Sequence, residues 1–135
     1  QALVDYNRDT GLDDVVRSAA DRDLATLEKM LQVQMREHTS PVAYLRALQR
    51  YFNRLYFIRG KVEAGAGVEE IIKSLKPPVF FKQVPLLTRH VHGWSLDQIV
   101  KAIKFLISAE LSCKTSDIPP LPASSRKLFQ LTQIR

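Results

Sequence analysis

Apolar residues recur every three or four positions along most of the chain, which is the spacing of amphipathic helices. The clearest helix start is Ser40-Pro41, because serine caps free backbone N–H groups and proline is tolerated at the first helical position. The pattern then predicts a helix of about 22 residues, roughly 33 Å long, that stops at Glu63-Ala64-Gly65. Its wide apolar arc indicates packing against several neighbours and comprises Tyr44, Leu45, Leu48, Tyr51, Phe52, Leu55, Tyr56, Ile58 and Val62.

Shorter helical patterns precede this segment. A first short helix is predicted from the spacing of Leu12, Val15, Val16 and Ala19. The next helix has either Asp21 or Asp23 as its N-cap, and its apolar stripe comprises Leu24, Leu27, Leu31 and Gln34.

Further helical patterns follow the long segment. A short helix over Val68–Leu75 ends before Pro77-Pro78, and a second apolar series, Val84, Leu87 and Val91, closes at Gly93. Ser95-Leu96-Asp97-Gln98 is a capping box, so a helix is expected to run from there to about Ser112. Its apolar positions are Ile99, Ile103, Leu106, Ile107 and Leu111. A proline-rich loop, Thr115–Pro122, and a last helix, Ala123–Ile134, complete the pattern.

Five glycines and the lack of alternating apolar runs argue against a sheet. The sequence therefore predicts an all-α, compact, bundle-like domain of about six to seven helices. Residues 1–10 are polar and unpatterned, so we expect a linker there and one helical domain over residues 11–135. The chain begins at Gln1 without an initiator methionine, which suggests a fragment of a longer protein or a processed form.

The composition favours a cytoplasmic protein. No apolar run approaches the roughly 18 residues of a membrane span. The single cysteine, Cys113, excludes an intrachain disulfide and suits a reducing compartment.

Motifs of catalysis and metal binding are missing from the sequence. It has no glycine-rich phosphate loop, nucleophile elbow or Cys-x-x-Cys pair. His90, His92 and Cys113 match no standard zinc spacing, and two histidines two positions apart on a helix point about 200° apart. We therefore expect no catalytic, cofactor-binding or metal site, and interpret these histidines as ordinary surface or interface residues.

The net charge of +6 is unevenly distributed. Residues 1–39 carry five basic and eight acidic side chains (5 − 8 = −3), and residues 40–135 carry fifteen and six (15 − 6 = +9). On the long helix, Arg46, Arg50 and Arg54 follow a spacing of four, with Phe57 and Lys61 nearby. This stripe is either a solvated helix face or a surface that contacts a protein partner or DNA. Arg59 interrupts the apolar arc and must extend to solvent, pair with a carboxylate or lie at an interface.

Several strings resemble the delta subunit of bacterial DNA polymerase III, a component of the clamp loader. Residues 40–50, SPVAYLRALQR, resemble the opening of the long helix in that family. Residues 77–82, PPVFFK, followed by Trp94-Ser95-Leu96, resemble a stretch of α-proteobacterial delta subunits, and residues 110–115, ELSCKT, resemble the end of the following helix. The three matches occur in the family's order.

The resemblance implies the C-terminal collar domain of delta, with residues 1–10 as the tail of a preceding lid domain. Such a domain is non-catalytic and holds a pentameric ring together by packing against the gamma/tau and delta-prime subunits. The parent complex is an ATP-dependent clamp loader, and delta binds the sliding clamp through an N-terminal module that would precede this chain. Candidate residues at the domain edge are Phe57, Trp94, Phe105 and Phe129. The alternative function is a nucleic-acid-binding helical module that uses the basic helix face.

Overall fold

The computed structural model describes residues 10–115 and 128–134. Its helices are α2 (Thr10–Ala20), α3 (Leu24–Arg36), α4 (Pro41–Glu63), α5 (Val68–Lys73), the 3₁₀ turn η1 (Phe81–Gln83), α6 (Val84–Gly93) and α7 (Leu96–Thr115), and residues 128–131 are also helical. The described residues include no strand, so the prediction of an all-α domain is confirmed. None of the helices described is long and apolar enough to cross a membrane. The predicted loop at 115–122 lies outside the described residues except for its first residue, and the last helix is described only from residue 128.

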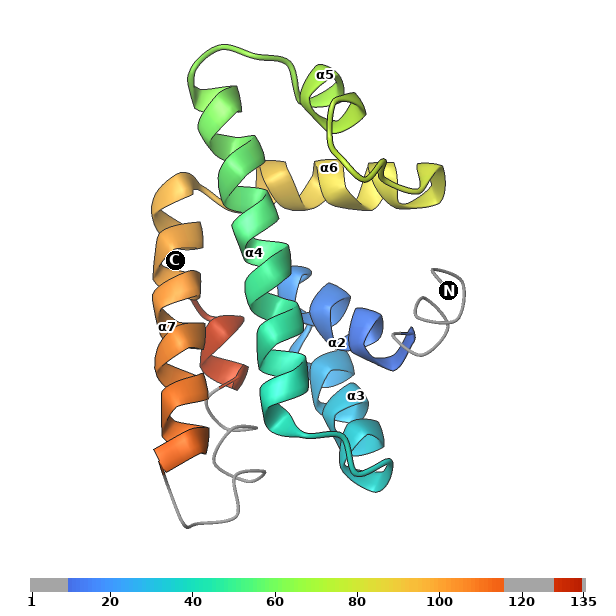
Figure 1. Ribbon diagram of the computed structural model, residues 1–135, viewed down its shortest axis with the longest axis vertical. Helices are drawn as coiled ribbons and strands as arrows, with labels where there is room; N and C mark the ends of the chain where they lie inside the picture. Colours follow the sequence, from blue (N-terminus) through green and yellow to red (C-terminus); the bar gives the residue numbers. More distant parts are fainter. Residues whose placement is uncertain (1–9, 116–127, 135) are drawn as a thin grey trace.

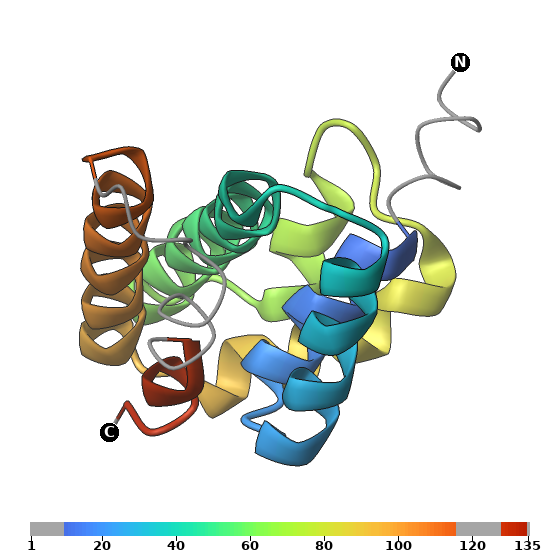
Figure 2. The same cartoon turned by 90° about the horizontal axis from the view of Figure 1, so that it is seen from below.

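α4 is the central element of the fold (Figure 1). α7 packs along one side of it in the antiparallel direction, and α2 and α3 lie on the other side. α6 crosses near the C-terminal half of α4, with α5 above it. Viewed from the end, α4 lies between α7 and the α2–α3 pair (Figure 2), as its wide apolar arc predicts.

The structure contains the capping hydrogen bonds expected at the predicted helix starts. The Ser40 hydroxyl accepts a hydrogen bond from the Val42 N–H at 3.2 Å. At α3, Asp23 and not Asp21 is the cap, accepting from the Thr26 N–H at 3.2 Å. At α7 both halves of the capping box form: the Ser95 N–H donates to Gln98 Oε1 at 2.9 Å, and the Gln98 N–H donates to Ser95 Oγ at 3.2 Å. Local sequence alone therefore specifies where these helices begin.

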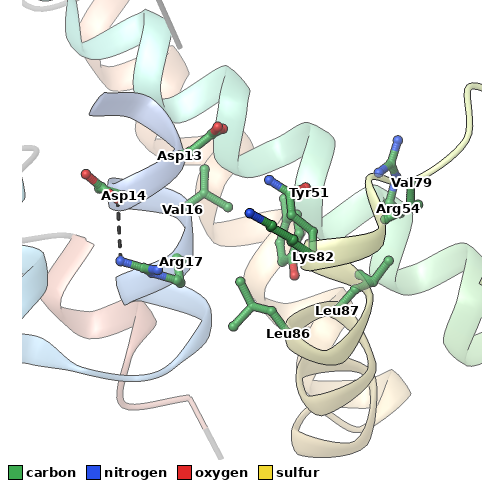
Figure 3. Close-up of a pocket in the computed structure, with 11 residues that line it drawn as sticks. Asp13, Asp14, Val16, Arg17, Tyr51, Arg54, Val79, Lys82, Leu86 and Leu87 are labelled. Atoms are coloured by element: carbon green, nitrogen blue, oxygen red, sulfur yellow. Dashed lines mark ion pairs between the residues drawn. The ribbon is translucent and has the colours of Figure 1, made fainter. Parts of the chain in front are cut away.

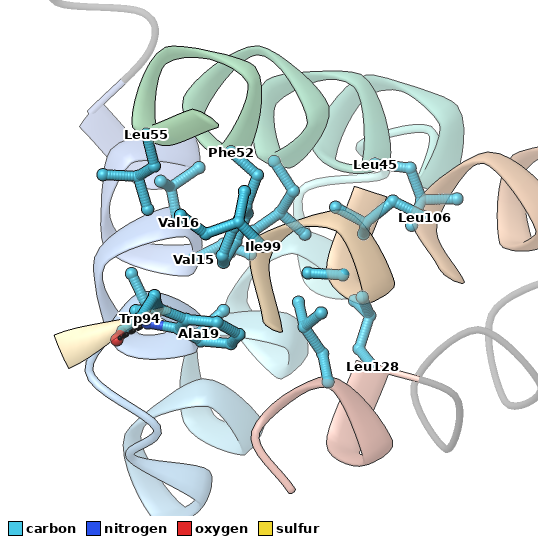
Figure 4. Close-up of a cluster of buried hydrophobic side chains, with 14 of the residues drawn as sticks. Val15, Val16, Ala19, Leu45, Phe52, Leu55, Trp94, Ile99, Leu106 and Leu128 are labelled. Carbon is cyan, nitrogen blue, oxygen red and sulfur yellow. Dashed lines mark hydrogen bonds between the residues drawn. The ribbon is translucent and has the colours of Figure 1, made fainter. Parts of the chain in front are cut away.

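The core surrounds Trp94, which is 1 % exposed. Its ring packs edge-on against Phe52, with ring centroids 4.8 Å apart, and its indole N–H donates to the Ala20 carbonyl at 2.9 Å. Burial of each large apolar side chain contributes about 1.5–3 kcal/mol. Of the candidates for the domain edge, Trp94 therefore belongs to the core. Figure 4 shows it within the main cluster, which includes Val15, Val16, Ala19, Leu45, Phe52, Leu55, Ile99, Leu106 and Leu128.

Arg22 connects the turn after α2 to the C-terminal part of the domain. Its guanidinium carbon lies 3.8 Å from the Trp94 ring centroid, a cation–π contact. The same guanidinium donates to Gln98 Oε1 at 3.3 Å and to the Ile134 carbonyl. One side chain therefore holds residues 128–134 against α7 and the core.

Some positions expected in the core are exposed. Tyr56, placed on the apolar arc of α4, is 47 % exposed. Leu24, in the first turn of α3, is also exposed. α5 ends at Lys73, earlier than predicted, and α7 extends to Thr115.

Candidate interaction surface on α4 and α7

The predicted basic stripe lies along the outer side of α4, but its members differ in their surroundings. Arg46, Arg50, Phe57 and Lys61 are exposed, whereas Arg54 is half-buried on the side of α4 that faces α2 and α6. One edge of the stripe thus lies next to α7, and the other edge lies next to a cleft between α2, α4 and the η1–α6 segment. The five residues therefore share a helix but differ in exposure, and their role as a contact surface stays a prediction.

Arg46 is already engaged within the domain. Its Nη2 atom lies 3.1 Å and its Nε atom 3.2 Å from Glu110 Oε2 on α7. The Gln49 amide donates to the other carboxylate oxygen, Glu110 Oε1, at 2.7 Å. Because Arg46 is more than half exposed, the pair contributes no more than about 1 kcal/mol, but it neutralises Arg46 and sets the α4–α7 register. Arg46 therefore carries an ion pair within the domain, while more than half of its side chain remains exposed.

Phe57 and Lys61 form a unit of their own on α4. The Lys61 ammonium lies 5.0 Å from the centroid of the Phe57 ring, a cation–π contact worth about 0.5–1 kcal/mol at an exposed site. Phe57 nevertheless leaves about half of its surface exposed. It remains available as an aromatic contact residue.

The structure adds two apolar residues to this surface that the sequence placed in the core. Ile107 is 48 % and Leu111 is 58 % exposed, one turn apart on α7. Ile107 lies about 60° around the α7 axis from Glu110, and Phe57 lies about 20° around the α4 axis from Arg46. Since Glu110 and Arg46 join the two helices, Ile107 and Leu111 lie next to that contact, and Phe57 points outward about three turns further along α4. We call Phe57, Ile107 and Leu111 the α4–α7 face.

Arg59, which interrupts the apolar arc, is satisfied inside the domain. Its Nε atom lies 2.9 Å from Glu63 Oε2, and its Nη1 donates to the Val91 carbonyl at 3.2 Å. Of the three expectations for this residue, pairing with a carboxylate is confirmed.

A polar network lies between α2, α4 and α6. The Tyr51 hydroxyl is 2.6 Å from His90 Nδ1, His90 Nε2 is 2.6 Å from Asp21 Oδ1, and Arg89 Nη2 is 2.7 Å from the same Asp21 oxygen. Burial lowers the pKa of His90 although Asp21 opposes this change. The ring is therefore neutral at pH 7, donates through Nε2 to Asp21 and accepts from Tyr51 at Nδ1.

The network is structural. Burial raises the pKa of Tyr51, the opposite of what an activated nucleophile requires. Burial acts to raise the pKa of the Asp21 carboxyl, but hydrogen bonds from Arg89 and His90 outweigh this effect, so the pKa is lowered. The interpretation of His90 as a surface or interface histidine was wrong, because α2 and α4 enclose its ring, whereas His92 is exposed.

The described residues contain no group of three His, Cys, Asp or Glu side chains placed to hold a metal ion. Cys113 is half-buried and packs against the hydrophobic core.

Comparison with known proteins gives one informative similarity. No protein-family model and no solved structure matches the chain. The chain is 33% identical over 109 residues to a protein of Rickettsia prowazekii (strain Madrid E) named "Probable DNA polymerase III subunit delta". The alignment covers 81% of this chain and 32% of that protein, so the chain spans about a third of the relative's length. The similarity therefore supports the relation to DNA polymerase III delta subunits that the sequence motifs predict.

Proposed function

We propose that the chain is a non-catalytic subunit-assembly domain of a bacterial clamp-loader delta subunit, with residues 11–135 as the collar domain. In this function it packs against gamma/tau and delta-prime subunits in the cytoplasm and keeps a ring together for loading of the sliding clamp during DNA replication. Contact with the clamp belongs to another module of the subunit. The similarity to a delta subunit supports the replication context.

The observation that carries the assembly proposal is the α4–α7 face. Exposed apolar and aromatic side chains that cluster on one side of a helical pair are typical of protein interfaces. Phe57 and Leu111 are each about half exposed or more, and Ile107 lies between them along the helix pair. A neighbouring helix that covered them would remove this apolar surface from water.

The test is co-purification with the gamma and delta-prime subunits of the same organism. Wild-type chain should be retained, and an Ile107→Glu, Leu111→Glu variant should bind at least about tenfold more weakly, because it would bury two unpaired carboxylates. Met35→Glu is the matched control, since Met35 is an equally exposed apolar residue on α3. Failure of the wild-type chain to bind either subunit contradicts the assembly function, and equal binding by the double variant contradicts the assigned face.

Nucleic-acid binding is the second candidate function, favoured by two exposed cations on α4. Arg50 forms no ion pair within the described residues, and Lys61 contacts only the Phe57 ring there. Fluorescence anisotropy with a labelled primer–template at low and moderate salt tests this function. Binding should fall steeply with salt, and Arg50→Glu with Lys61→Glu should reduce the salt slope by about two. Absence of binding at low salt excludes it.

A further inference from the structure

A cleft opens on the side of α4 opposite to α7. It has a volume of about 410 Å³ and lies between α2, α4 and the η1–α6 segment. Figure 3 shows side chains from all three elements around it. Its lining consists of Asp13, Asp14, Val16, Arg17, Tyr51, Arg54, Val79, Lys82, Gln83, Leu86 and Leu87.

One part of the cleft wall is apolar. Val16 and Leu87 belong to the hydrophobic core, and Val79 packs against it. Leu86 is half-buried beside Leu87. A ligand in this cleft therefore gains from burying aliphatic groups against a wall that the core holds in place.

The three cations of the cleft differ in their pairing with the residues that the structure describes. Arg17 pairs with Asp14 at 3.5 Å. Arg54 and Lys82, in contrast, form no hydrogen bond or ion pair with any described residue. In Figure 3, Lys82 extends from η1 over the middle of the cleft, whereas Arg54 stands at the end next to Val79. The site thus presents two separated positive charges beside an apolar wall.

Two exposed phenylalanines lie between lining residues of the cleft in the sequence, although they are not among the lining residues themselves. Phe80 is about half exposed and Phe81 is 71 % exposed, with their ring centroids 5.1 Å apart. They lie between the lining residues Val79 and Lys82. An exposed aromatic pair of this kind is typical of protein interfaces.

We propose that this cleft binds a short acidic and hydrophobic segment of a partner protein. Carboxylates of the segment pair with Lys82 and Arg54, and its apolar side chains lie against Val79, Leu86 and Leu87. This inference goes beyond the assembly function, because the cleft lies on the side of α4 opposite to α7, which carries Ile107 and Leu111.

The charge pattern favours a peptide over a nucleic acid. Besides Val16 and the Asp14–Arg17 ion pair, the α2 side of the cleft carries Asp13, whose carboxylate would repel the successive phosphates of a polynucleotide backbone. A peptide can instead place its carboxylates at the two cations and leave the α2 side to apolar or neutral groups.

The experiment uses the full 135-residue chain and three fluorescein-labelled probes. These are an eight-residue peptide of alternating leucine and glutamate, its leucine–glutamine counterpart and an oligothymidylate of eight nucleotides. Fluorescence anisotropy measures affinity, and amide chemical shifts locate the binding site. The glutamate peptide should bind at the cleft, and the glutamine peptide at least about tenfold more weakly.

Variants distinguish binding at the cleft from a general attraction of the acidic peptide to the positively charged chain. Arg54→Gln and Lys82→Gln should each weaken the glutamate peptide about tenfold, while Lys104→Gln on α7 should leave it unchanged. Circular dichroism verifies that each variant is folded. The proposal is overturned if both peptides bind equally, if the shifts lie outside the cleft, or if the oligothymidylate binds more tightly with the same dependence on Arg54 and Lys82.

Discussion

Replacement of Tyr51 by phenylalanine removes one hydroxyl group from the network that joins α2, α4 and α6. That hydroxyl lies 2.6 Å from His90 Nδ1, while His90 Nε2 is held by Asp21. In Tyr51→Phe the aromatic packing against Phe52 is kept, but the buried His90 Nδ1 atom loses its donor. An unsatisfied buried acceptor costs about 1–3 kcal/mol, so the free energy of unfolding should fall by that amount.

Urea denaturation measures this loss. Unfolding is monitored by circular dichroism and by the fluorescence of Trp94, the single tryptophan. The matched control is Tyr56→Phe on the same helix, whose exposed hydroxyl has no hydrogen bond within the described residues. The control should change stability by less than about 0.5 kcal/mol. If Tyr51→Phe is no less stable than Tyr56→Phe, the hydrogen bond to His90 contributes nothing and the reasoning is refuted.

The same network predicts a loss of stability on mild acidification. Burial lowers the pKa of His90 in the folded chain below its ordinary value of 6.5. As the pH falls through 6.5, the unfolded chain takes up a proton that the folded chain does not, so the free energy of unfolding decreases. The slope is at most about 1.4 kcal/mol per pH unit.

Urea denaturation at a series of pH values from about 7.5 to 5 tests this sign. His90→Gln should remove most of the dependence, whereas His92→Gln should retain it because His92 is exposed. A stability that does not change over this range in the wild-type chain would contradict a buried neutral His90.

Three further substitutions test single elements of the fold. Arg22→Ala removes the cation–π contact with Trp94 and the bond to Gln98, and should cost about 2 kcal/mol. Hydrogen exchange at residues 128–134 should then be faster, and unchanged exchange there would argue against the proposed connection. Ser95→Ala removes the cap of α7 and should cost about 1 kcal/mol in urea denaturation. His38→Gly relieves a left-handed backbone (φ 60°) and should raise stability by about 0.5–1 kcal/mol; a decrease would show that this conformation is not strained.

The two proposals divide the surface of α4 between different partners. The α4–α7 face is apolar and suits a neighbouring subunit of an assembly. The cleft next to α2 and α6 carries two cations that no described residue pairs, and it suits an acidic segment. Arg54, grouped with Arg46 and Arg50 by its spacing, belongs to the cleft. Substitutions on one side should therefore leave binding at the other side unchanged.

The sequence by itself determined the helical class and the helix starts of this protein. Ser40, Asp23 and the Ser95–Gln98 pair act on backbone groups within three residues of themselves, so their effect is local and readable from the order of residues. Periodicity likewise identified most buried positions of α4, because a helix repeats its faces every 3.6 residues.

Only the tertiary structure decided which apolar positions were covered and which charges were paired. Ile107 and Leu111 repeat with helical spacing like Leu106, yet no neighbouring element in the described part of the chain buries them. Arg46 meets Glu110 across 64 residues of sequence, and Asp21 meets His90 across 69. Such contacts depend on how helices pack side by side, and the periodicity of one helix contains no information about the position of the next.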